Sequence, residues 1–284
     1  MDLKKTIQQI ESLPSPDFVL QKIVDTANNP SASAKDLNEV ASKDPAFVAK
    51  ILKLANSAYY GLPRNVSKLT EAIMILGFKT VRNMALSIFT NKEFFNFESK
   101  ELNLKEFWKH SIVVATIGEL TAEKIGYSNK EELFMCGLLH DIGKSVQGVL
   151  FPGLLDAIVK LAKTKKISYY EAEKLLEIPT HEIFAEILVE KWNFPELVLI
   201  SASRHHRPDS MRNSIYSDPV NIITLSTFIA ERMGLGDNGG GRHIDVPKYC
   251  WDELGFTPVL FDELIASVED KVRKIDEFMN IQGE

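Results

Sequence analysis

The chain has 284 residues, of which 45% are hydrophobic and 25% charged, and its formal net charge is −6. These are globular proportions, and a chain of this length buries about 70–75% of its unfolded surface, so bulk stability requires neither disulfides nor structural metals. The negative charge disfavours nonspecific binding to nucleic acids or anionic lipids, although it is unevenly spread: residues 1–100 carry +3 and residues 101–284 carry −9.

Cysteine content and hydropathy indicate the compartment. Cys136 and Cys250 are too few for a disulfide framework and fit a reducing environment. The N-terminal stretch MDLKKTIQQIESLPSPDF lacks the continuous apolar core of a signal peptide, and nowhere do about 18 uncharged apolar residues follow one another. We therefore expect a cytoplasmic protein without a membrane span.

Helical periodicity runs through the N-terminal part. The apolar residues after Pro16 fall at i, i+3, i+4 and i+7, the spacing of one helix face; they are Leu20, Ile23, Val24 and Ala27. Ser33 and Asp36 form a capping pair for the next helix, and Asp44-Pro45 supply the N-cap and first-turn proline of a third. Two more helices follow, the first ending at Gly77.

The rest of the chain also reads as helices. The polar stretch 91–103 marks a boundary, and beyond it the periodicity predicts helices at roughly 104–125, 130–147, 153–163, 168–177, 181–192, 195–206, 218–233 and 258–280. The segment 234–247 contains Gly239-Gly240-Gly241 and is predicted to be a flexible loop. Strand-like alternation is scarce, so we expect an all-α fold with segments 1–95, 96–235 and 236–284.

Five of the six histidines lie between residues 110 and 206. His110 is on the apolar face of its predicted helix, and His140-Asp141 lie on an inward face with Lys144 one turn beyond. A buried imidazole beside a carboxylate is costly unless the two are paired or bind a metal. Both interpretations stay open: hydrogen-bonded core residues, or a divalent metal site in which Asp141 bridges two ions and Lys144 holds an anion.

The other histidines lie at predicted helix ends. His181 begins a helix, and His205-His206 end the helix that starts at Pro195. A histidine at a helix C-terminus can simply interact with the helix dipole, worth about 0.3–1 kcal/mol when protonated. Two adjacent imidazoles cannot point the same way, however, so one can bind a metal while its neighbour binds a second ion or a substrate. Glu106, one turn before His110, is either a further oxygen ligand or an exposed charge.

The series His110, His140-Asp141-Ile142-Gly143-Lys144, His181 and His205-His206 resembles the metal-binding series of HD-superfamily phosphohydrolases, particularly the branch that hydrolyses cyclic dinucleotides. The stretches SLPSPDFVLQKIVD, DPAFVAKILKLANSAYYGL, KLTEAIMILGFKTVRNMAL and HEIFAEILVEKWNFPELV resemble the HDOD proteins, which are HD-related output domains of bacterial signalling. The resemblance covers roughly residues 10 to 235. It implies an all-α fold in which a small N-terminal bundle packs on an HD-like helical core that carries the histidine site.

The resemblance also implies roles for these residues. It predicts six metal ligands: His110, His140, Asp141, His181, His205 and His206. The first three would hold one ion, and the last three would hold a second with Asp141 as the bridge. In an active enzyme Asp141 and Lys144 would act on a phosphate ester. Imidazole-rich sites with one carboxylate suit iron or manganese, with zinc, nickel and cobalt as alternatives.

Two departures from the superfamily pattern bear on catalysis. Thr227 stands where the superfamily places a last aspartate, and only Glu231, one turn later, could replace it by reaching back. The Gly-Tyr-Pro signature of cyclic di-GMP hydrolases does not follow the histidine pair. We therefore expect a signalling output protein with a metal site and little or no catalysis. The alternatives are a metal-dependent phosphohydrolase with a nucleotide, cyclic-nucleotide or other phosphate ligand, and a helical scaffold whose histidines are structural.

Partners follow from charge and from missing modules. Basic residues surround a loop with Tyr59-Tyr60, whose rings could stack on a base; they are Lys50, Lys53, Arg64, Lys68, Lys79 and Arg82. A charge of +3 over 100 residues is small for nucleic-acid binding, so a solvated helix surface is favoured and nucleic acid is unlikely. No receiver, cyclase or helix-turn-helix module is evident, so an output role requires a signalling protein partner in trans.

Overall fold

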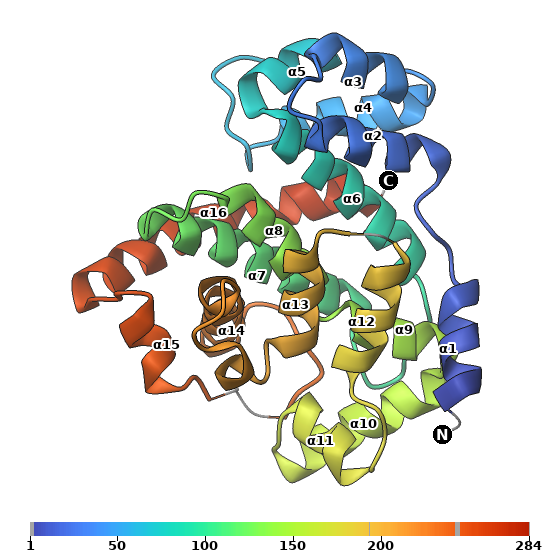
Figure 1. Cartoon of the computed structure of the whole chain (residues 1–284), viewed down its shortest axis with the longest axis vertical. Helices are drawn as coiled ribbons and strands as arrows, with labels where there is room; N and C mark the ends of the chain where they lie inside the picture. The colour runs from blue at the N-terminus through green and yellow to red at the C-terminus, as the bar shows by residue number, and fades with distance from the viewer. Residues whose placement is uncertain (1–2, 193, 242–244, 284) are drawn as a thin grey trace. The chain divides into compact units, whose positions relative to one another are not determined.

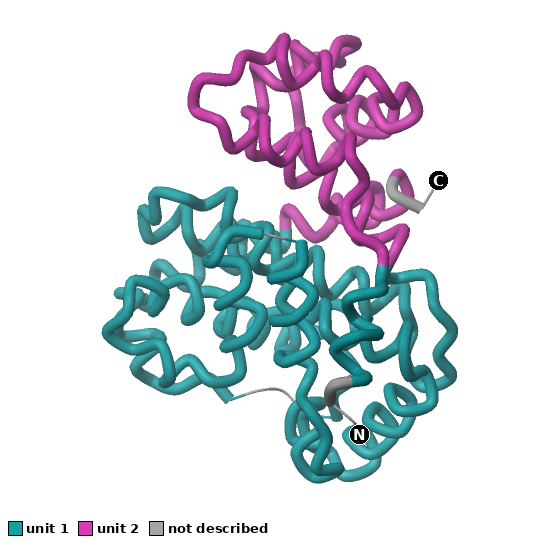
Figure 2. Tube along the Cα trace, turned by 45° about the vertical axis from the view of Figure 1, so that its right-hand side comes forward, with its two compact units in different colours: residues 1–13, 94–269 teal, residues 14–93, 270–284 magenta. Residues whose placement is uncertain are grey.

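A computed structural model describes residues 3–192, 194–241 and 245–283. The described chain is all-α, as the sequence predicts, with α-helices, one short 3-10 helix and no strand in those ranges (Figure 1). It divides into two compact units (Figure 2). Unit 1 comprises residues 1–13 and 94–269, and unit 2 comprises residues 14–93 and 270–284. The partition into segments 1–95, 96–235 and 236–284 stays a prediction.

Helix bounds follow the predicted ones closely in most of the chain. Unit 2 contains α2 (Phe18–Asn28), α3 (Ala34–Ala41), α4 (Pro45–Ala55), α5 (Leu69–Leu76) and nearly all of α6 (Phe78–Phe94). Unit 1 contains α1 (Leu3–Ser12), α7 (Leu104–Lys124), α8 (Lys130–Leu139), α9 (Ile142–Leu150), α10 (Pro152–Lys165), α11 (Tyr169–Leu175), α12 (His181–Lys191), α13 (Glu196–Arg204), the 3-10 helix η1 (Pro208–Met211), α14 (Ser217–Arg232) and α15 (Lys248–Glu253). The last helix, α16 (Pro258–Gly283), runs from unit 1 into unit 2.

The caps predicted in unit 2 are confirmed. α2 buries its four predicted apolar residues. Ser33 and Asp36 form a reciprocal capping box at the start of α3, and the Asp44 side chain accepts a hydrogen bond from the Phe47 backbone NH at the start of α4. Gly77 separates α5 from α6 with a φ of 86°, a conformation that glycine adopts without strain.

Two residues of the basic N-terminal part lie inside unit 2 rather than on its surface. Tyr59 is 3% exposed, and its ring contacts those of Tyr60 and Phe278. Arg82 is fully buried and donates to the side chains of Asn28 and Asn83. Neither side chain can therefore contact a nucleic acid, because both are buried in the core of unit 2 and not on the basic surface predicted from the sequence.

Unit 1 is built around α7, whose residues are buried over most of its length. α7 packs against α8 and α14, while α12 packs against α9 and α13. Two close approaches depend on glycine. A Cβ on Gly137 would lie 2.6 Å from the Ala115 Cα, and one on Gly143 would lie 1.9 Å from the His181 carbonyl oxygen. These contacts bring α8 onto α7 and α9 onto α12.

The single helix expected at 130–147 is wrong in one respect, because it is broken in the middle. α8 ends at Leu139 and α9 begins at Ile142. His140 is the C-cap of α8, and Asp141 is the N-cap of α9 with φ −103° and ψ 12°. Neither residue of the break is a proline or a glycine, and the break turns both side chains toward each other.

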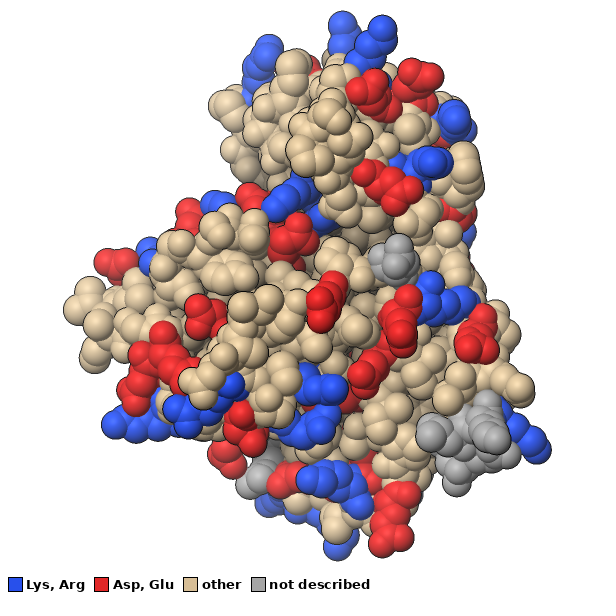
Figure 3. Space-filling view, in the orientation of Figure 1, with Lys and Arg blue, Asp and Glu red and all other residues tan. Residues whose placement is uncertain are grey.

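Within the described ranges, no single helix combines the length and apolar character needed to cross a bilayer. Only α5 and α6 taken together reach that composition, and they are bent by 115° relative to one another. On the face drawn in Figure 3, basic side chains lie interspersed with acidic ones.

Candidate metal centre

The predicted histidines converge inside unit 1, each brought by a helix or a helix end. His110 comes from the middle of α7, His181 is the first residue of α12, and His205 and His206 follow the last turn of α13. The break between α8 and α9 supplies His140 and Asp141. All these residues and Lys144 are at most 1% exposed, except His206, which is half-buried.

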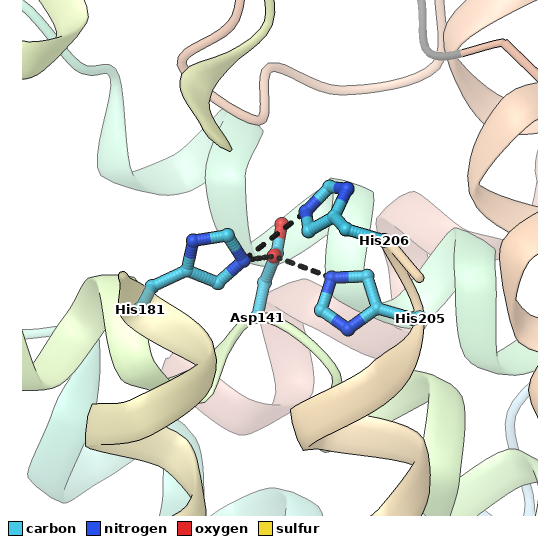
Figure 4. Close-up of side chains that lie close together, drawn as sticks. All are labelled: Asp141, His181, His205 and His206. Carbon is cyan, nitrogen blue, oxygen red and sulfur yellow. Dashed lines mark hydrogen bonds and ion pairs between the residues drawn. The ribbon is translucent and has the colours of Figure 1, made fainter. Parts of the chain in front are cut away.

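One oxygen of Asp141 faces the histidines of α12 and α13. Asp141 Oδ1 lies 3.3 Å from His181 Nε2 and 3.5 Å from His205 Nε2. Figure 4 draws these contacts as dashed lines. His206 Nε2 lies 3.2 Å from His181 Nε2, and its ring stacks on Tyr170 with centroids 4.7 Å apart. Three imidazole nitrogens therefore surround one side of the carboxylate.

The other oxygen faces α7, α8 and a lysine. Asp141 Oδ2 lies 3.3 Å from His140 Nε2 and 4.0 Å from His110 Nε2. Lys144 Nζ donates to the same oxygen at 2.6 Å. Because each oxygen faces its own set of nitrogens, Asp141 belongs to two groups that could each hold a metal ion: Asp141, His181, His205 and His206, and His110, His140 and Asp141. Within each group the candidate ligand atoms lie within 4.8 Å of one another.

Several of these atoms are buried without a hydrogen-bond partner. They are His110 Nε2, His140 Nε2, His205 Nε2 and Asp141 Oδ1. Leaving a buried polar atom unsatisfied costs about 1–3 kcal/mol, and four such atoms aimed at one interior region form a site that could hold a cation.

The far nitrogens of the imidazoles are held in place. His140 Nδ1 lies 2.7 Å from the Gly137 carbonyl oxygen, and His205 Nδ1 lies 3.2 Å from that of Ala202. A carbonyl oxygen can only accept, so each Nδ1 carries a proton, and in the neutral form of each ring Nε2 would present a lone pair. Metal-binding histidines are held in this way, so the residues fit a divalent transition metal.

Burial lowers the pKa of three of the imidazoles. The pKa of His110 and that of His205 fall to about 3, with desolvation as the largest cause. Desolvation also puts the pKa of His206 well below its usual value. These imidazoles are therefore neutral at pH 7, which is the form that binds a metal.

Asp141 and His181 stay charged in spite of burial. Desolvation by itself raises the pKa of Asp141, but the neighbouring His140 and Lys144 outweigh it and hold this pKa well below its usual range. Desolvation is also the largest effect on His181, but Glu173 and Asp141 together outweigh it and raise its pKa to about 9. A cation that binds His181 must therefore displace a proton, so metal uptake by the cluster would release protons.

No carboxylate stands where the last aspartate of the superfamily is expected. Thr227 is buried, and its hydroxyl donates to the Ile223 carbonyl of its own helix. The Glu231 side chain accepts from Asn238 Nδ2 at 2.5 Å and belongs to neither group of candidate ligands. Glu106 also lies outside both groups.

The described residues of the segment predicted as a flexible loop at 234–247 form a loop without a helix, and residues 236–238 pack against the site. Gly236, with φ 81°, packs so closely on the His110 backbone that a Cβ would lie 2.5 Å from the His110 nitrogen. The Asp237 NH donates to the Glu106 carbonyl, and the Asn238 carbonyl accepts from Lys144 Nζ at 3.1 Å. Residues 242–244 lie outside the described ranges.

Two cavities border the cluster, one at each of the two groups of candidate ligands. A cavity of about 190 Å³ is lined by His205 and His206 and carries the carboxylates of Glu171, Asp209 and Asp245. A second, of about 280 Å³, is lined by His110 and carries the carboxylates of Glu231 and Asp237. Neither has a lysine or arginine among the described residues that line it.

Two carboxylates next to the histidines escaped the sequence reasoning. Glu173 is fully buried and accepts from His181 Nδ1 at 2.7 Å, and Glu182 is buried and accepts from the His206 NH. A signal for Glu173 existed. Tyr169, Ala172 and Glu173 fall at i, i+3 and i+4 and are all buried, so the glutamate shares the inward face of α11.

Comparison with known proteins places the chain in a family. The family model of the HDOD domain matches residues 13–208. An uncharacterized protein of Treponema pallidum (strain Nichols) is 24% identical over 201 residues, which make up 70% of this chain and 38% of that protein. The chain thus spans well under half the length of this relative.

Three solved structures share the fold. An HDOD domain protein of unknown function from Geobacter sulfurreducens has a TM-score of 0.79 and 22% identity, covering 98% of this chain and 99% of that one. A protein of Marinobacter aquaeolei VT8, provisionally assigned to signal transduction, has a TM-score of 0.78 and 22% identity, covering 99% and 64%. A provisionally assigned phosphohydrolase of Shewanella amazonensis SB2B has a TM-score of 0.72 and 22% identity, covering 98% and 97%.

Proposed function

The chain belongs to the HDOD family, and from this premise we propose that it is a signal-transduction output protein whose buried histidine–aspartate cluster binds one or two divalent transition-metal ions, with little or no catalysis. Iron or manganese is the favoured metal, because the donor set is five imidazoles and one carboxylate. A signalling protein partner supplies its input in trans.

The observation that carries the proposal is the charge of the two cavities that reach the cluster. Both are lined by carboxylates, and the described lining residues include no lysine or arginine. A phosphate ester carries negative charge, and enzymes that transfer phosphoryl groups gather cationic side chains where that charge develops. The carboxylate linings, in which Asp237 is paired with a lysine outside the cavity, Lys163, disfavour such a substrate and favour the approach of a metal cation.

Two features inside the cluster also favour binding over catalysis. Lys144, a cation beside the cluster that could hold a phosphate, is already engaged by Asp141 and by the Asn238 carbonyl. Thr227 leaves the ion of His110 and His140 without the oxygen ligand that the superfamily supplies there. That ion is therefore held less tightly than the one at His181, His205 and His206.

A metal-dependent phosphohydrolase is the second candidate, favoured by the placement of Asp141. Its two oxygens face the two ligand groups separately, as a carboxylate bridging two ions requires. Bound ions in such a site would supply an activated water and stabilise charge on a phosphate ester. Lys144 would orient the phosphate, provided that it leaves Asp141.

Metal analysis combined with a hydrolysis panel tests the proposal. Protein purified without chelator is expected to contain iron or manganese, and Asp141→Ala to contain little of either. Across a panel of nucleotides, cyclic nucleotides and phosphodiesters, the wild-type protein should hydrolyse no substrate faster than Asp141→Ala. Hydrolysis that disappears with Asp141→Ala would favour the phosphohydrolase, and absence of any bound metal would exclude both candidates.

A further inference from the structure

Glu173 is a buried carboxylate that belongs to neither group of candidate ligands but touches one of them. It lies on α11 and is fully buried. Its Oε1 accepts from the His181 backbone NH at 2.6 Å and from Gln147 Nε2 at 2.8 Å, and its Oε2 accepts from His181 Nδ1 at 2.7 Å. The N-cap residue Thr180 makes no side-chain cap, so Glu173 caps α12 from another helix.

The direction of every hydrogen bond in this chain of side chains is fixed by chemistry. A carboxylate only accepts, so Gln147 must turn its NH₂ group toward Glu173. The amide oxygen of Gln147 then faces Tyr169, whose hydroxyl donates to it at 2.7 Å. Tyr169 is 1% exposed and Gln147 is fully buried, so no water competes for these groups. The carboxylate is therefore held with both oxygens aimed at donors.

The position of the Glu173 carboxylate determines which ring nitrogen of His181 carries the proton when the imidazole is neutral. Since Glu173 Oε2 accepts a hydrogen bond from Nδ1–H, the proton stays on Nδ1 and the ring turns Nε2 toward Asp141 Oδ1 at 3.3 Å and His206 Nε2 at 3.2 Å. We propose that Glu173, held by Gln147 and Tyr169, is a positioning residue that keeps His181 in the tautomer able to bind the ion shared with His205 and His206. The inference rests on the metal binding proposed above.

An isosteric substitution separates this role from packing. In Glu173→Gln, the amide oxygen at the Oε1 position would keep the hydrogen bonds from the His181 NH and from Gln147. The NH₂ group then stands at the Oε2 position and donates to His181 Nδ1, which forces the ring proton onto Nε2 and blocks metal binding. The opposite amide orientation would set the NH₂ group against two donors and lose both bonds.

Zinc is the probe, because it is diamagnetic and binds imidazole. The wild-type protein and Glu173→Gln are labelled with ¹⁵N-histidine, titrated with zinc, and examined by NMR. In the wild type, His181 is expected to bind zinc through Nε2 and to carry its proton on Nδ1. In Glu173→Gln, His181 should carry the proton on Nε2, and zinc affinity at this half of the cluster should fall about 10–100-fold.

Glu182→Gln is the matched control. Glu182 is 1% exposed, and it accepts from the His206 backbone NH and from Arg207 rather than from an imidazole nitrogen. Its substitution removes a buried negative charge near the same ion without changing a tautomer, so zinc binding at His181 should match the wild type. Equal losses in both variants would assign the effect to charge and overturn the proposal, as would wild-type zinc binding in Glu173→Gln.

A second variant covers a failure of Glu173→Gln to fold. Tyr169→Phe keeps the ring under the Lys144 ammonium, 4.8 Å from its centroid, but removes the donor that fixes Gln147. Zinc affinity at His181 is expected to fall by a smaller factor, and an unchanged affinity would overturn the proposal. A wild-type protein that binds no zinc, iron or manganese would instead overturn the proposed function, and this inference with it.

Discussion

Lys144 places a positive charge against the carboxylate oxygen that His110 and His140 also face. Its ammonium lies 2.6 Å from Asp141 Oδ2 and is 1% exposed. A divalent cation at this half of the cluster must share the oxygen with a fixed like charge, or displace it. Lys144 is therefore expected to lower the affinity of this half for metal, in addition to any part in holding a phosphate.

Lys144→Met should accordingly bind divalent metal more tightly. Removing a buried positive charge beside the carboxylate is expected to raise affinity at least about tenfold, which corresponds to about 1.4 kcal/mol. Competition with a metal chelator measures this affinity. Lys163→Met is the control, because Lys163 pairs with Asp237 at 3.0 Å but is 41% exposed. An unchanged or weaker affinity in Lys144→Met would refute the role of this charge.

The buried histidines make the stability of the metal-free protein depend on pH in both directions. The pKa of His110 and that of His205 are lowered to about 3 in the folded protein. Below the unfolded-state pKa of 6.5, the unfolded chain therefore binds protons at these residues that the folded chain does not bind, and this destabilises the fold. Each is expected to cost about 2 kcal/mol at pH 5. His181, with its pKa raised to about 9, stabilises the fold fully below 6.5 and loses this contribution as the pH rises through 9.

Urea unfolding of the protein freed of metal with a chelator, at pH 5, 6.5 and 8, measures how these opposing contributions add up in the free energy of unfolding. Stability is expected to be greatest near pH 6.5 and to fall on both sides, with the steeper loss toward acid. His110→Asn should make the acid loss shallower, because it removes one of the titrating groups. Stability that increases from pH 6.5 to 5 would contradict the neutral state assigned to His110 and His205.

Among the residues of the site, the histidines could be identified from the sequence because the residue type is rare in this chain. Glu173 could not, because its role depends on how its helix packs against other helices. His110, His140, His181 and the histidine pair are few, and their order along the chain matches a known series, so their convergence could be expected. Glu173 is one of many glutamates. Its role depends on which face of α11 meets α9 and α12, and side-chain spacing alone does not determine that.

Between residue and fold, the break between α8 and α9 is the element that shapes the site. The apolar positions on both sides fit one continuous helix, so the periodicity conceals the break. In the structure the Gly143 backbone lies against the His181 carbonyl, where a Cβ would come within 1.9 Å. This close approach of α9 to α12 sets the distance between Asp141 and His181.

Gly143→Ala is therefore expected to destabilise the fold by about 2–3 kcal/mol, since a methyl group must push two helices apart. Gly153→Ala is the matched control: Gly153 is exposed in the first turns of α10, and a Cβ there meets nothing within 4 Å. The control should be neutral or stabilise by up to about 1 kcal/mol. Urea unfolding compares the two, and equal stabilities would contradict the close approach.

Helix starts in unit 2 could be predicted from the sequence, while the packing of the loop after α14 could not. The Ser33–Asp36 and Asp44–Pro45 caps depend on neighbours three residues apart or fewer. The loop is held instead by distant residues, including Glu106 on α7 and Ile167 after α10. From the sequence alone its glycines predict mobility, but in the structure they permit close contact of the loop with α7 and α10.

On the scale of the whole chain, every candidate ligand lies in unit 1. A ligand that binds only the folded state stabilises it by about 2.7 kcal/mol at 100 times its dissociation constant, and the gain goes to the unit that unfolds with the site. Metal should therefore slow amide hydrogen exchange in α7, α8, α9, α12 and α13 by up to about 100-fold. Amides of residues 14–93 should be unaffected, and Asp141→Ala should show no slowing at all. Equal slowing in residues 14–93 would mean that the two units unfold together.

The docking of α1 has a consequence for synthesis of the chain on the ribosome. α1 packs against α9 and α12, Ile10 is fully buried, and the Leu13 carbonyl accepts from Lys191, 178 residues later. At about 5–20 residues per second, this partner emerges on the order of 10–40 s after Leu13 has been made. For that interval the apolar side of α1 lacks the part of its partner surface that α12 provides. The packing around α1 is therefore completed only after translation has passed α12, although α1 is among the first helices to be made.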